Sequence, residues 1–107
     1  MAPRVTLTYT TALILDVLAR GHRYGFEIMD VTGLPSGTVY PALRRLESLG
    51  QVASHWEEEA AATREGRPAR RYYTLAGAGE RVLAEARRRF PALGRWDAAF
   101  GGDASPA

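Results

Sequence analysis

Hydrophobic residues recur at helical spacing in two stretches near the start of the chain. Residues 7–19 carry a wide apolar face, and Gly21 stands where a helix C-cap is expected. Residues 24–32 repeat apolar side chains at i, i+4 and i+7, which is the period of an amphipathic helix. The segment 33–35 ends this second stretch, because a residue before proline avoids the α region. The pattern predicts two helices joined by a short turn.

A third helix is predicted to start at Ser36 or Thr38, because both residue types are good N-caps. If Thr38 is the cap, Pro41 falls in the first turn, where its missing N–H costs nothing. If Ser36 is the cap, one helical hydrogen bond is lost and the turn must distort. Gly50 closes the helix about three turns later.

Residues 38–49 of this helix separate into two faces when they are placed at 100° intervals. The side predicted to join the core carries Val39, Ala42, Leu43, Leu46 and Leu49. The other side carries Tyr40, Pro41, Arg44 and Ser48, with Thr38 and Arg45 at its edge. The predicted exposed face is therefore polar, basic and aromatic.

Two segments after the third helix have the character of strands. Residues 52–57 are extended in type, and residues 70–75 alternate, with Tyr73 and Leu75 as the expected inward pair. Between them, residues 58–69 predict a loop or hairpin tip. The pattern favours an antiparallel hairpin, although its connection is long.

A fourth helix is predicted from residue 78, and Pro91 is expected to kink or restart it. Its apolar stripe consists of Val82, Leu83, Ala86, Phe90, Leu93, Trp96 and Phe100. Such a stripe is too apolar for an exposed helix and indicates a dimer interface, while packing within its own subunit remains the alternative. We expect one domain over residues 1–101, including a C-terminal dimerisation helix at about 78–100, and a disordered tail at 102–107.

Composition excludes several classes of protein. A chain of 107 residues fits one domain. The absence of cysteine excludes a disulfide framework, a thiolate metal site and a cysteine nucleophile. No apolar run approaches the ~20 residues that span a membrane, and the N-terminus lacks the apolar region of a signal peptide. We expect a soluble cytoplasmic protein that needs no metal or cofactor.

The positive charge consists entirely of arginine. The formal net charge of +2 says little, but all fourteen basic side chains are arginine, which binds phosphate or guanine through two parallel hydrogen bonds. A GC-rich coding bias also favours arginine, so its distribution is more informative. Four arginines lie in the eight residues 64–71, which contain a single acid, Glu65. Of these, Arg71 shares a side with Tyr73 and is expected to pair internally with a carboxylate.

The order helix, helix, helix, hairpin, helix predicts a mostly α-helical α+β fold, the winged helix-turn-helix. Its third helix would enter the major groove of double-stranded DNA and its hairpin would form a basic wing. The predicted DNA-contacting residues are Ser36, Thr38, Tyr40, Arg44 and Arg45 on the helix, and Arg64, Arg67 and Arg70 on the wing. Alternatives remain: a solvated face for the helix arginines, a hydrophobic brace against the second helix for Tyr40, and wing arginines neutralised by nearby glutamates.

Three motifs together resemble the PadR-like transcriptional regulators over about residues 7–90. They are Tyr-Gly-Phe-Glu-Ile at 24–28, Ser-Gly-Thr-Val-Tyr-Pro-Ala-Leu-Arg-Arg-Leu-Glu at 36–47, and Arg-Arg-Tyr-Tyr-Thr-Leu at 70–75. The resemblance implies a homodimeric DNA-binding repressor, with the wing on the flanking backbone or minor groove and the C-terminal helix pairing the subunits. The chain resembles the short subgroup, with one C-terminal helix.

The resemblance also implies a possible small effector. Some members sense aromatic or hydrophobic molecules at or near the dimer interface, where Trp56, Trp96 and Phe100 would offer stacking surfaces. The chain departs from the family at Ala76, where members commonly place a threonine that caps the next helix. We therefore expect a weaker start of that helix, by ~1 kcal/mol.

Competing functions have less support in the sequence. His22 and His55 are far apart, and no paired carboxylate motif or serine elbow accompanies them, so an enzyme is not expected. The segment 77–79 is half of a dinucleotide-binding motif and lacks its third glycine. The alternative that remains is a winged-helix module that binds protein without direct DNA readout.

Overall fold

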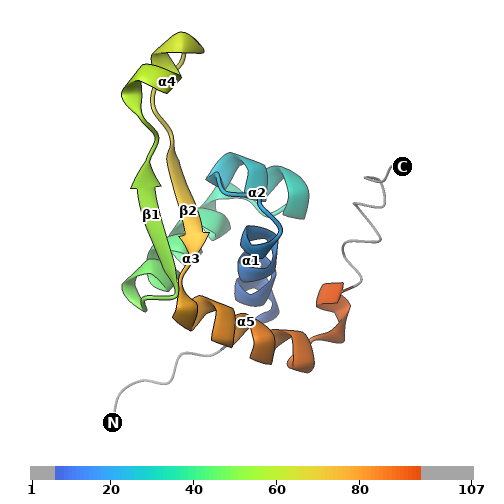
Figure 1. Ribbon diagram of the computed structural model, residues 1–107. Helices are drawn as coiled ribbons and strands as arrows, with labels where there is room; N and C mark the ends of the chain where they lie inside the picture. Colours follow the sequence, from blue (N-terminus) through green and yellow to red (C-terminus); the bar gives the residue numbers. More distant parts are fainter. Residues whose placement is uncertain (1–6, 95–107) are drawn as a thin grey trace, which may run out of the picture.

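The computed structural model describes residues 7–94 and consists of a helical body from which a two-stranded wing projects (Figure 1). The elements in chain order are α1 (Tyr9–Ala19), α2 (Gly25–Thr32), α3 (Ser36–Ser48), β1 (Val52–Trp56), α4 (Glu59–Arg64), β2 (Arg71–Leu75), α5 (Gly77–Arg89) and a 3-10 turn (Pro91–Gly94). The prediction of a mostly helical α+β winged helix-turn-helix is confirmed. The tail at 102–107 lies outside the described residues.

Helix α1 is the centre of the core. Every residue from Ala12 to Leu18 is buried, so the helix is covered on all sides. Burying one large aliphatic side chain contributes about 1.5–3 kcal/mol, which makes this short helix the main hydrophobic support of the body. It begins at Tyr9, two residues later than predicted, because the Thr8 hydroxyl accepts a hydrogen bond from the Thr11 N–H (3.1 Å) and caps it there.

Helix α3 begins with Pro35 as its N-cap, so neither Ser36 nor Thr38 serves as the cap. The Pro35 carbonyl accepts hydrogen bonds from the N–H groups of Thr38 (2.9 Å) and Val39 (3.0 Å), which fixes the first turn. Pro41 consequently lies inside the helix and cannot donate to the carbonyl of Gly37. Gly37 is exposed, so water can reach that carbonyl. The hydroxyls of Ser36 and Thr38 are left without a capping role.

The two faces of α3 lie largely as predicted. Val39, Leu43 and Leu46 are almost completely buried against α1 and α2, while Arg44 and Arg45 are exposed. Leu49 was predicted to join the core but is 37% exposed. It is the C-cap residue, where the backbone leaves the helix and the 100° period no longer applies.

The wing is held at both edges of β2. Strands β1 and β2 pair antiparallel, from Val52 opposite Leu75 to Trp56 opposite Arg71. On its other edge β2 forms a bridge with Tyr24, and the Tyr73 N–H donates to the carbonyl of the preceding Arg23 (2.9 Å). This third, very short strand was not predicted. It fixes the base of the wing to the segment between α1 and α2.

The tip of the wing is a short helix, α4, where the sequence predicted a loop or hairpin tip. Its segment Glu-Ala-Ala-Ala-Thr-Arg contains three alanines, the strongest helix formers. Glu59 in its first turn and Arg64 in its last turn match the helix dipole. Ala62 is buried and Gly66, with φ of 71°, turns the chain back toward β2. The tip is therefore a folded cap on the hairpin.

Helix α5 is joined to α1 through a buried carboxylate. Asp16 of α1 has no exposed surface and accepts hydrogen bonds from Arg20 Nε (2.8 Å) and from Arg87 Nη2 of α5 (2.7 Å). A buried charge is tolerated only when it is paired in this way. Helix α5 begins at Gly77 with Ala76 as N-cap and without a side-chain capping bond, so the cap that family members commonly have is missing here. Pro91 restarts the chain as a 3-10 turn, as predicted.

Candidate nucleic-acid interface

The exposed face of α3 carries two guanidinium groups that are available to a partner. Arg44 and Arg45 are exposed, and within residues 7–94 neither of them forms an ion pair. The hydroxyl-bearing Ser36 and Thr38 lie about two turns earlier, at the N-terminal end of the same helix. Donors of this kind at a helix N-terminus suit phosphate contacts, while arginines further along suit base edges.

The side chain of Tyr40 both packs within the protein and remains partly exposed to a partner. Its ring lies so close to Gly25 of α2 that a Cβ atom there would come within 2.4 Å of Tyr40 Cε1. The brace against the second helix is therefore present. The residue is nevertheless 37% exposed, so the same ring also offers surface to a partner. The glycine of the Tyr-Gly-Phe motif is what allows α2 and α3 to approach this closely.

Arg71 is held internally, as predicted. Its Nη2 donates to the Ser54 hydroxyl (2.7 Å) and lies 3.6 Å from Glu47 Oε2, and the same hydroxyl donates to that carboxylate (2.7 Å). This network runs from β2 through β1 to the last turns of α3. It fixes the orientation of the wing relative to the exposed face of α3.

Arg67 differs from Arg64 and Arg70 because its guanidinium is already paired with a carboxylate, that of Glu57. Its Nη2 donates to Glu57 Oε2 (2.8 Å), and a second bond joins Nη1 to Oε1. The hydrogen bonds from Arg67 lower the pKa of Glu57 from 4.5 to about 2, and this pairing raises the pKa of Arg67 in turn. Glu57 Oε1 also accepts from the Arg70 N–H (3.2 Å). Arg67 thus closes the neck of the wing below α4.

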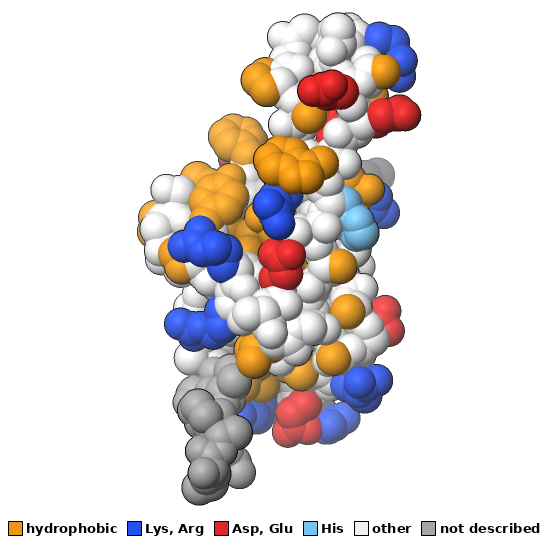
Figure 2. All heavy atoms as spheres, turned by 90° about the vertical axis from the view of Figure 1, so that its left-hand side faces the viewer, with side chains coloured by type: hydrophobic (Ala, Val, Ile, Leu, Met, Phe, Trp, Pro, Cys, Tyr) orange, Lys and Arg blue, Asp and Glu red, His pale blue; other side chains and the backbone are white. Residues whose placement is uncertain are grey.

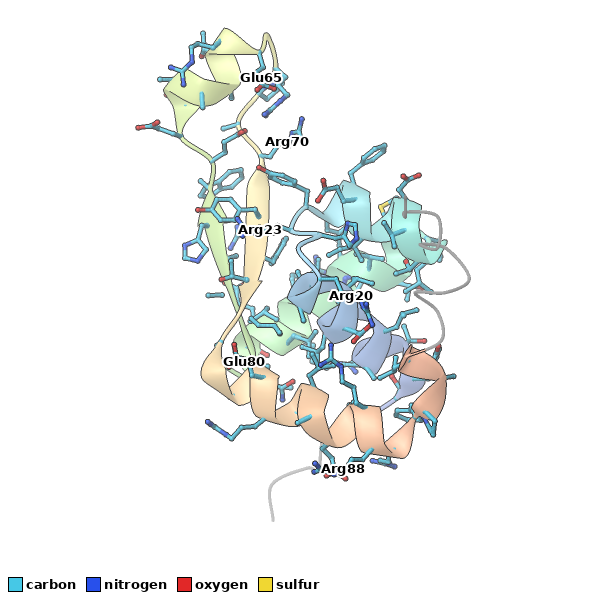
Figure 3. All side chains as sticks on the ribbon, turned by 45° about the vertical axis from the view of Figure 1, so that its right-hand side comes forward. Arg20, Arg23, Glu65, Arg70, Glu80 and Arg88 are labelled. Carbon is cyan, nitrogen blue, oxygen red and sulfur yellow. The ribbon has the colours of Figure 1, made fainter. Side chains whose placement is uncertain are left out.

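Arg64 and Arg70 remain exposed on the wing. Arg64 lies in the last turn of α4 and, within the described residues, forms no ion pair. The guanidinium of Arg70 lies 4.9 Å from the ring centre of Tyr24. Figure 3 shows Glu65 at the tip and Arg70 lower on the wing, toward the body. The wing therefore carries one exposed arginine at its tip, Arg64, and another closer to the body, Arg70 (Figure 3).

The apolar stripe of α5 is divided between the core and the surface. Leu83, Ala86 and Leu93 are buried within their own chain, where they belong to the core that surrounds α1. These three side chains are not available to a partner in this arrangement, contrary to the prediction. Val82 and Phe90 are only partly buried. Trp96 and Phe100 lie outside the described residues.

Trp56 lies far from the described part of the α5 stripe (Figure 1). It stands at the end of β1 that is far from α5 (Figure 1), and it is 65% exposed. Its ring is covered on one side by the guanidinium of Arg71, 5.5 Å from the ring centre. Within one chain, Trp56 and α5 do not frame a common effector pocket.

Neither Tyr24 nor Phe26 was predicted from the sequence to belong to a site; Tyr24 is half-buried and Phe26 is exposed. Phe26 is 73% exposed, more than any other large hydrophobic residue that the structure describes. A signal was present, because Phe26 lies off the apolar stripe that includes Tyr24 and Ile28. That offset places its ring on the outer face of α2.

Two other kinds of site find no support in residues 7–94. No group of three or more histidine, cysteine or acidic side chains is arranged to hold a metal ion there. In the same part of the chain, no helix has the length and apolar character needed to cross a bilayer.

Comparison with known proteins agrees with this architecture. A family model described as the transcriptional regulator PadR-like family matches residues 14–85. A PadR family transcription regulator from Clostridium difficile R20291 is similar in structure, with a TM-score of 0.68 and 26% identity, covering 87% of this chain and 98% of that one. A PadR family regulator from Eggerthella lenta gives a TM-score of 0.58 and 29% identity, covering 77% and 74%.

A transcriptional regulator from Clostridium thermocellum is also similar, with a TM-score of 0.63 and 25% identity, covering 86% of this chain and 89% of that one. No curated protein matches the sequence. The family match spans both the helix-turn-helix and the wing, and this family consists of transcriptional regulators rather than enzymes. The chain belongs to the PadR-like family of transcriptional regulators, which implies that it binds DNA.

Proposed function

We propose that the protein is a homodimeric repressor that acts in the cytoplasm and recognises a palindromic operator with α3 and the wing. The observation that carries this proposal is the pair Arg44 and Arg45, exposed and without ion pairs within residues 7–94, on the outer face of α3. Guanidinium groups on a helix of this kind contact guanine bidentately in the major groove. Ser36, Thr38 and Tyr40 on the same helix would contact phosphates or thymine methyl groups.

The wing would contribute phosphate contacts through Arg64 and Arg70. Arg67 is a weaker candidate for direct contact, because both terminal nitrogens of its guanidinium already donate to Glu57. We propose that its contribution is indirect, by holding the wing tip in place. The wing would therefore set the register of the protein on DNA, while α3 determines the sequence.

The test is the replacement of Arg44 and Arg45 by alanine, singly, with Arg88→Ala as the control. Arg88 is also an exposed arginine, but it lies on the side of α5 that faces away from α1 (Figure 3). Duplexes selected from a random pool by the wild-type protein supply the target, and fluorescence anisotropy gives the affinity. Each α3 variant should lose roughly 5- to 150-fold, from about 1–3 kcal/mol per bidentate contact. Wild-type affinity in both α3 variants would refute the assignment of α3.

The homodimer is proposed from a groove beside α5. This hollow of about 450 Å³ is lined by Leu7, Thr11, Gln51, Ala78, Arg81, Val82, Glu85 and Arg89. Its apolar floor and its rim of both charge signs suit a second copy of the chain, because an isologous contact brings the same patch from each subunit together. Two recognition helices related by a two-fold axis then match a palindrome.

Val82→Glu tests the dimer, because it places a charge on the floor of the groove. Ala84→Glu is the matched control, since Ala84 is exposed on α5 and lines a different hollow. Light scattering at micromolar concentration should give a dimer for the wild type and for Ala84→Glu, and a monomer for Val82→Glu. A wild-type monomer would exclude this part of the proposal.

Release of the operator by a small aromatic or hydrophobic molecule is proposed as the regulatory step. The apolar floor of the α5 groove supports a site for such a molecule at the proposed dimer interface. Trp56 would join such a site only through the partner subunit. Addition of a panel of aromatic compounds to the protein–DNA complex should identify one that lowers the anisotropy; if the panel leaves the complex unchanged, regulation by this class is not supported.

A further inference from the structure

Three exposed aromatic side chains of the described residues lie on α2, α3 and the wing. Phe26 is 73% exposed, Trp56 is 65% exposed and Tyr40 is 37% exposed. Figure 2 shows exposed hydrophobic side chains gathered below the wing tip, with arginine among them. A cluster of exposed apolar surface beside charged groups marks an interaction site rather than ordinary surface.

A hollow of about 240 Å³ lies between α2, α3 and β2. It is lined by Tyr24, Phe26, Tyr40, Arg70, Arg71 and Tyr73, together with Gly25. Its volume is several times the ~30 Å³ that one water molecule takes up in the liquid, so a phosphate group with bridging water fits in it. The phenol groups and guanidiniums at its wall are hydrogen-bond donors of the type that bind phosphate.

The charge around this hollow is predominantly positive. Arg70 and Arg71 line it, and burial raises the pKa of Tyr73 at its wall while the nearby guanidiniums of Arg71 and Arg44 act in the opposite direction. Two acidic groups of the described residues lie close to this cluster. Glu47 lies 3.6 Å from Arg71 and neutralises part of that charge, and Glu57 accepts a hydrogen bond from the Arg70 N–H (3.2 Å) but is itself paired with Arg67. Two of the guanidinium groups lie over aromatic rings, Arg70 at 4.9 Å from the ring centre of Tyr24 and Arg71 at 5.5 Å from that of Trp56.

We propose that this aromatic hollow seats one phosphate of the DNA backbone, with Phe26 and Trp56 packed on the deoxyriboses at either side. The inference rests on the proposed DNA-binding function and adds a third contact region, between the recognition helix and the wing. DNA is the occupant because the hollow is continuous with the proposed DNA-binding surface of α3 and the wing. Tyr40 of α3 and Arg70 of the wing both line it. Arg70 and the Tyr40 hydroxyl donate to the phosphate, and Arg71 supplies charge from its fixed position.

The experiment compares Phe26→Ala, Trp56→Ala and Leu49→Ala on a duplex selected from a random pool by the wild-type protein. Leu49 is a large exposed hydrophobic residue outside the hollow and serves as the matched control. Each aromatic variant should lose about 3- to 30-fold in affinity, as expected for one desolvated aromatic contact, and Leu49→Ala should retain it. Trp56→Phe should restore most of the loss, because it keeps the ring.

A second arm identifies the phosphate. Single methylphosphonate substitutions across the duplex remove one backbone charge at a time, and one position in each half-site should weaken the wild type while leaving Arg70→Ala unaffected. Inorganic phosphate at millimolar concentration should not displace the duplex, because it lacks the flanking sugars. Displacement by phosphate alone would instead show a small-anion site and overturn the proposal.

The outcomes separate this inference from the proposed function. If Phe26→Ala and Trp56→Ala bind at wild-type affinity while Arg44→Ala does not, the hollow has no role in DNA binding and the function stands. If the wild-type protein selects no duplex at all, the proposed function fails. If either aromatic variant changes the molar mass in light scattering, the cluster is a protein interface and the inference is wrong.

Discussion

Gly79 shows how closely a single residue can determine the packing of this fold. A Cβ atom at this position would lie 2.0 Å from the Gln51 carbonyl oxygen and 3.0 Å from Leu75 Cδ2. At Gly77 the nearest atom, Arg81 Nη1, would be 3.8 Å away. Gly79 therefore lies where α5 comes close to the start of the wing, whereas Gly77 faces open space. Packing therefore accounts for the second glycine of the half-motif at 77–79, and not for the first.

Gly79→Ala should destabilise the protein by about 1–3 kcal/mol or more, because the clash is with backbone that cannot move aside as a side chain can. Gly77→Ala should be neutral or stabilising by up to ~1 kcal/mol, since alanine is the better helix former and space is available. Urea denaturation at one protein concentration measures both free energies of unfolding. Equal effects of the two substitutions would show that the close approach of Gly79 does not matter.

Glu57 gives a pH-dependent prediction. Its pKa is lowered from 4.5 to about 2 by hydrogen bonds from Arg67, so the pair stabilises the neck of the wing fully above about pH 4.5 and loses that contribution as the pH falls toward 2. Carbon-detected NMR should show the Glu57 carboxyl titrating near pH 2 in the wild type. In Arg67→Ala the midpoint should rise toward 4.5, whereas Arg64→Ala should leave it low. A midpoint near 4.5 in the wild type would contradict the pairing.

At the scale of residues, the sequence predicts what depends on local periodicity. The buried and exposed faces of α3 follow from its 3.6-residue repeat, and only Leu49 at the helix end departs from it. The pairing of Arg67 with Glu57 was not predictable as a specific contact, because it spans ten residues and depends on how the hairpin closes. The same holds for Asp16, whose partner Arg87 is distant in sequence. A single acid in an apolar run was the available signal.

At the scale of elements, the helix propensity of residues 59–64 was underestimated. The segment 59–64 has the composition of a helix, yet six residues are too few to form one in isolation. Helix α4 forms because Ala62 is buried and because the chain leaving the helix bonds back to it, with the Arg67 N–H donating to the Ala62 carbonyl (3.2 Å). The bridge between Tyr24 and Tyr72 is likewise tertiary, since one residue carries no strand pattern. Both features decide how firmly the wing is held.

The N-terminus of α5 is a position where one substitution should increase the stability of the protein. Ala76 has the extended backbone of an N-cap, with φ of −89° and ψ of 171°, but no side chain that can accept a hydrogen bond. Ala76→Thr should raise the free energy of unfolding by about 0.5–2 kcal/mol, because its hydroxyl can bond a free N–H of the first turn. Ala76→Val is the control of equal shape. If both variants have the same stability in thermal or urea unfolding, no capping bond forms.

At the scale of the whole molecule, α5 packs against its own chain and is also proposed to join two subunits. Its inner side, including Leu83 and Ala86, completes the core of its own chain, and the groove beside Val82 is proposed to receive a second copy. An apolar stripe in a sequence cannot separate these uses, because core and interface both select apolar residues. The fold was therefore predictable from pattern and motif, whereas the division of α5 required the packed structure.

The whole molecule also determines how DNA binding responds to salt. If about three arginines of each subunit neutralise phosphates, a dimer displaces roughly six counterions, and log K should fall with log salt at a slope near −5. Anisotropy titrations between ~50 and ~200 mM salt measure this slope. Arg64→Ala should reduce its magnitude by about 2 per dimer, one unit for each subunit. A slope near zero would argue against DNA as the partner.

The buried carboxylate of Asp16 has a consequence for operator spacing. Because it ties α5 to α1 inside the body, we expect the proposed dimer to be rigid between the α5 groove and the helix that enters DNA. One added base pair rotates the half-sites by roughly 35° about the DNA axis, and a rigid pair of α3 helices cannot follow. Operators lengthened or shortened by one base pair should therefore lose most of their affinity in anisotropy assays, whereas Arg87→Ala, which loosens the tie, should tolerate them better.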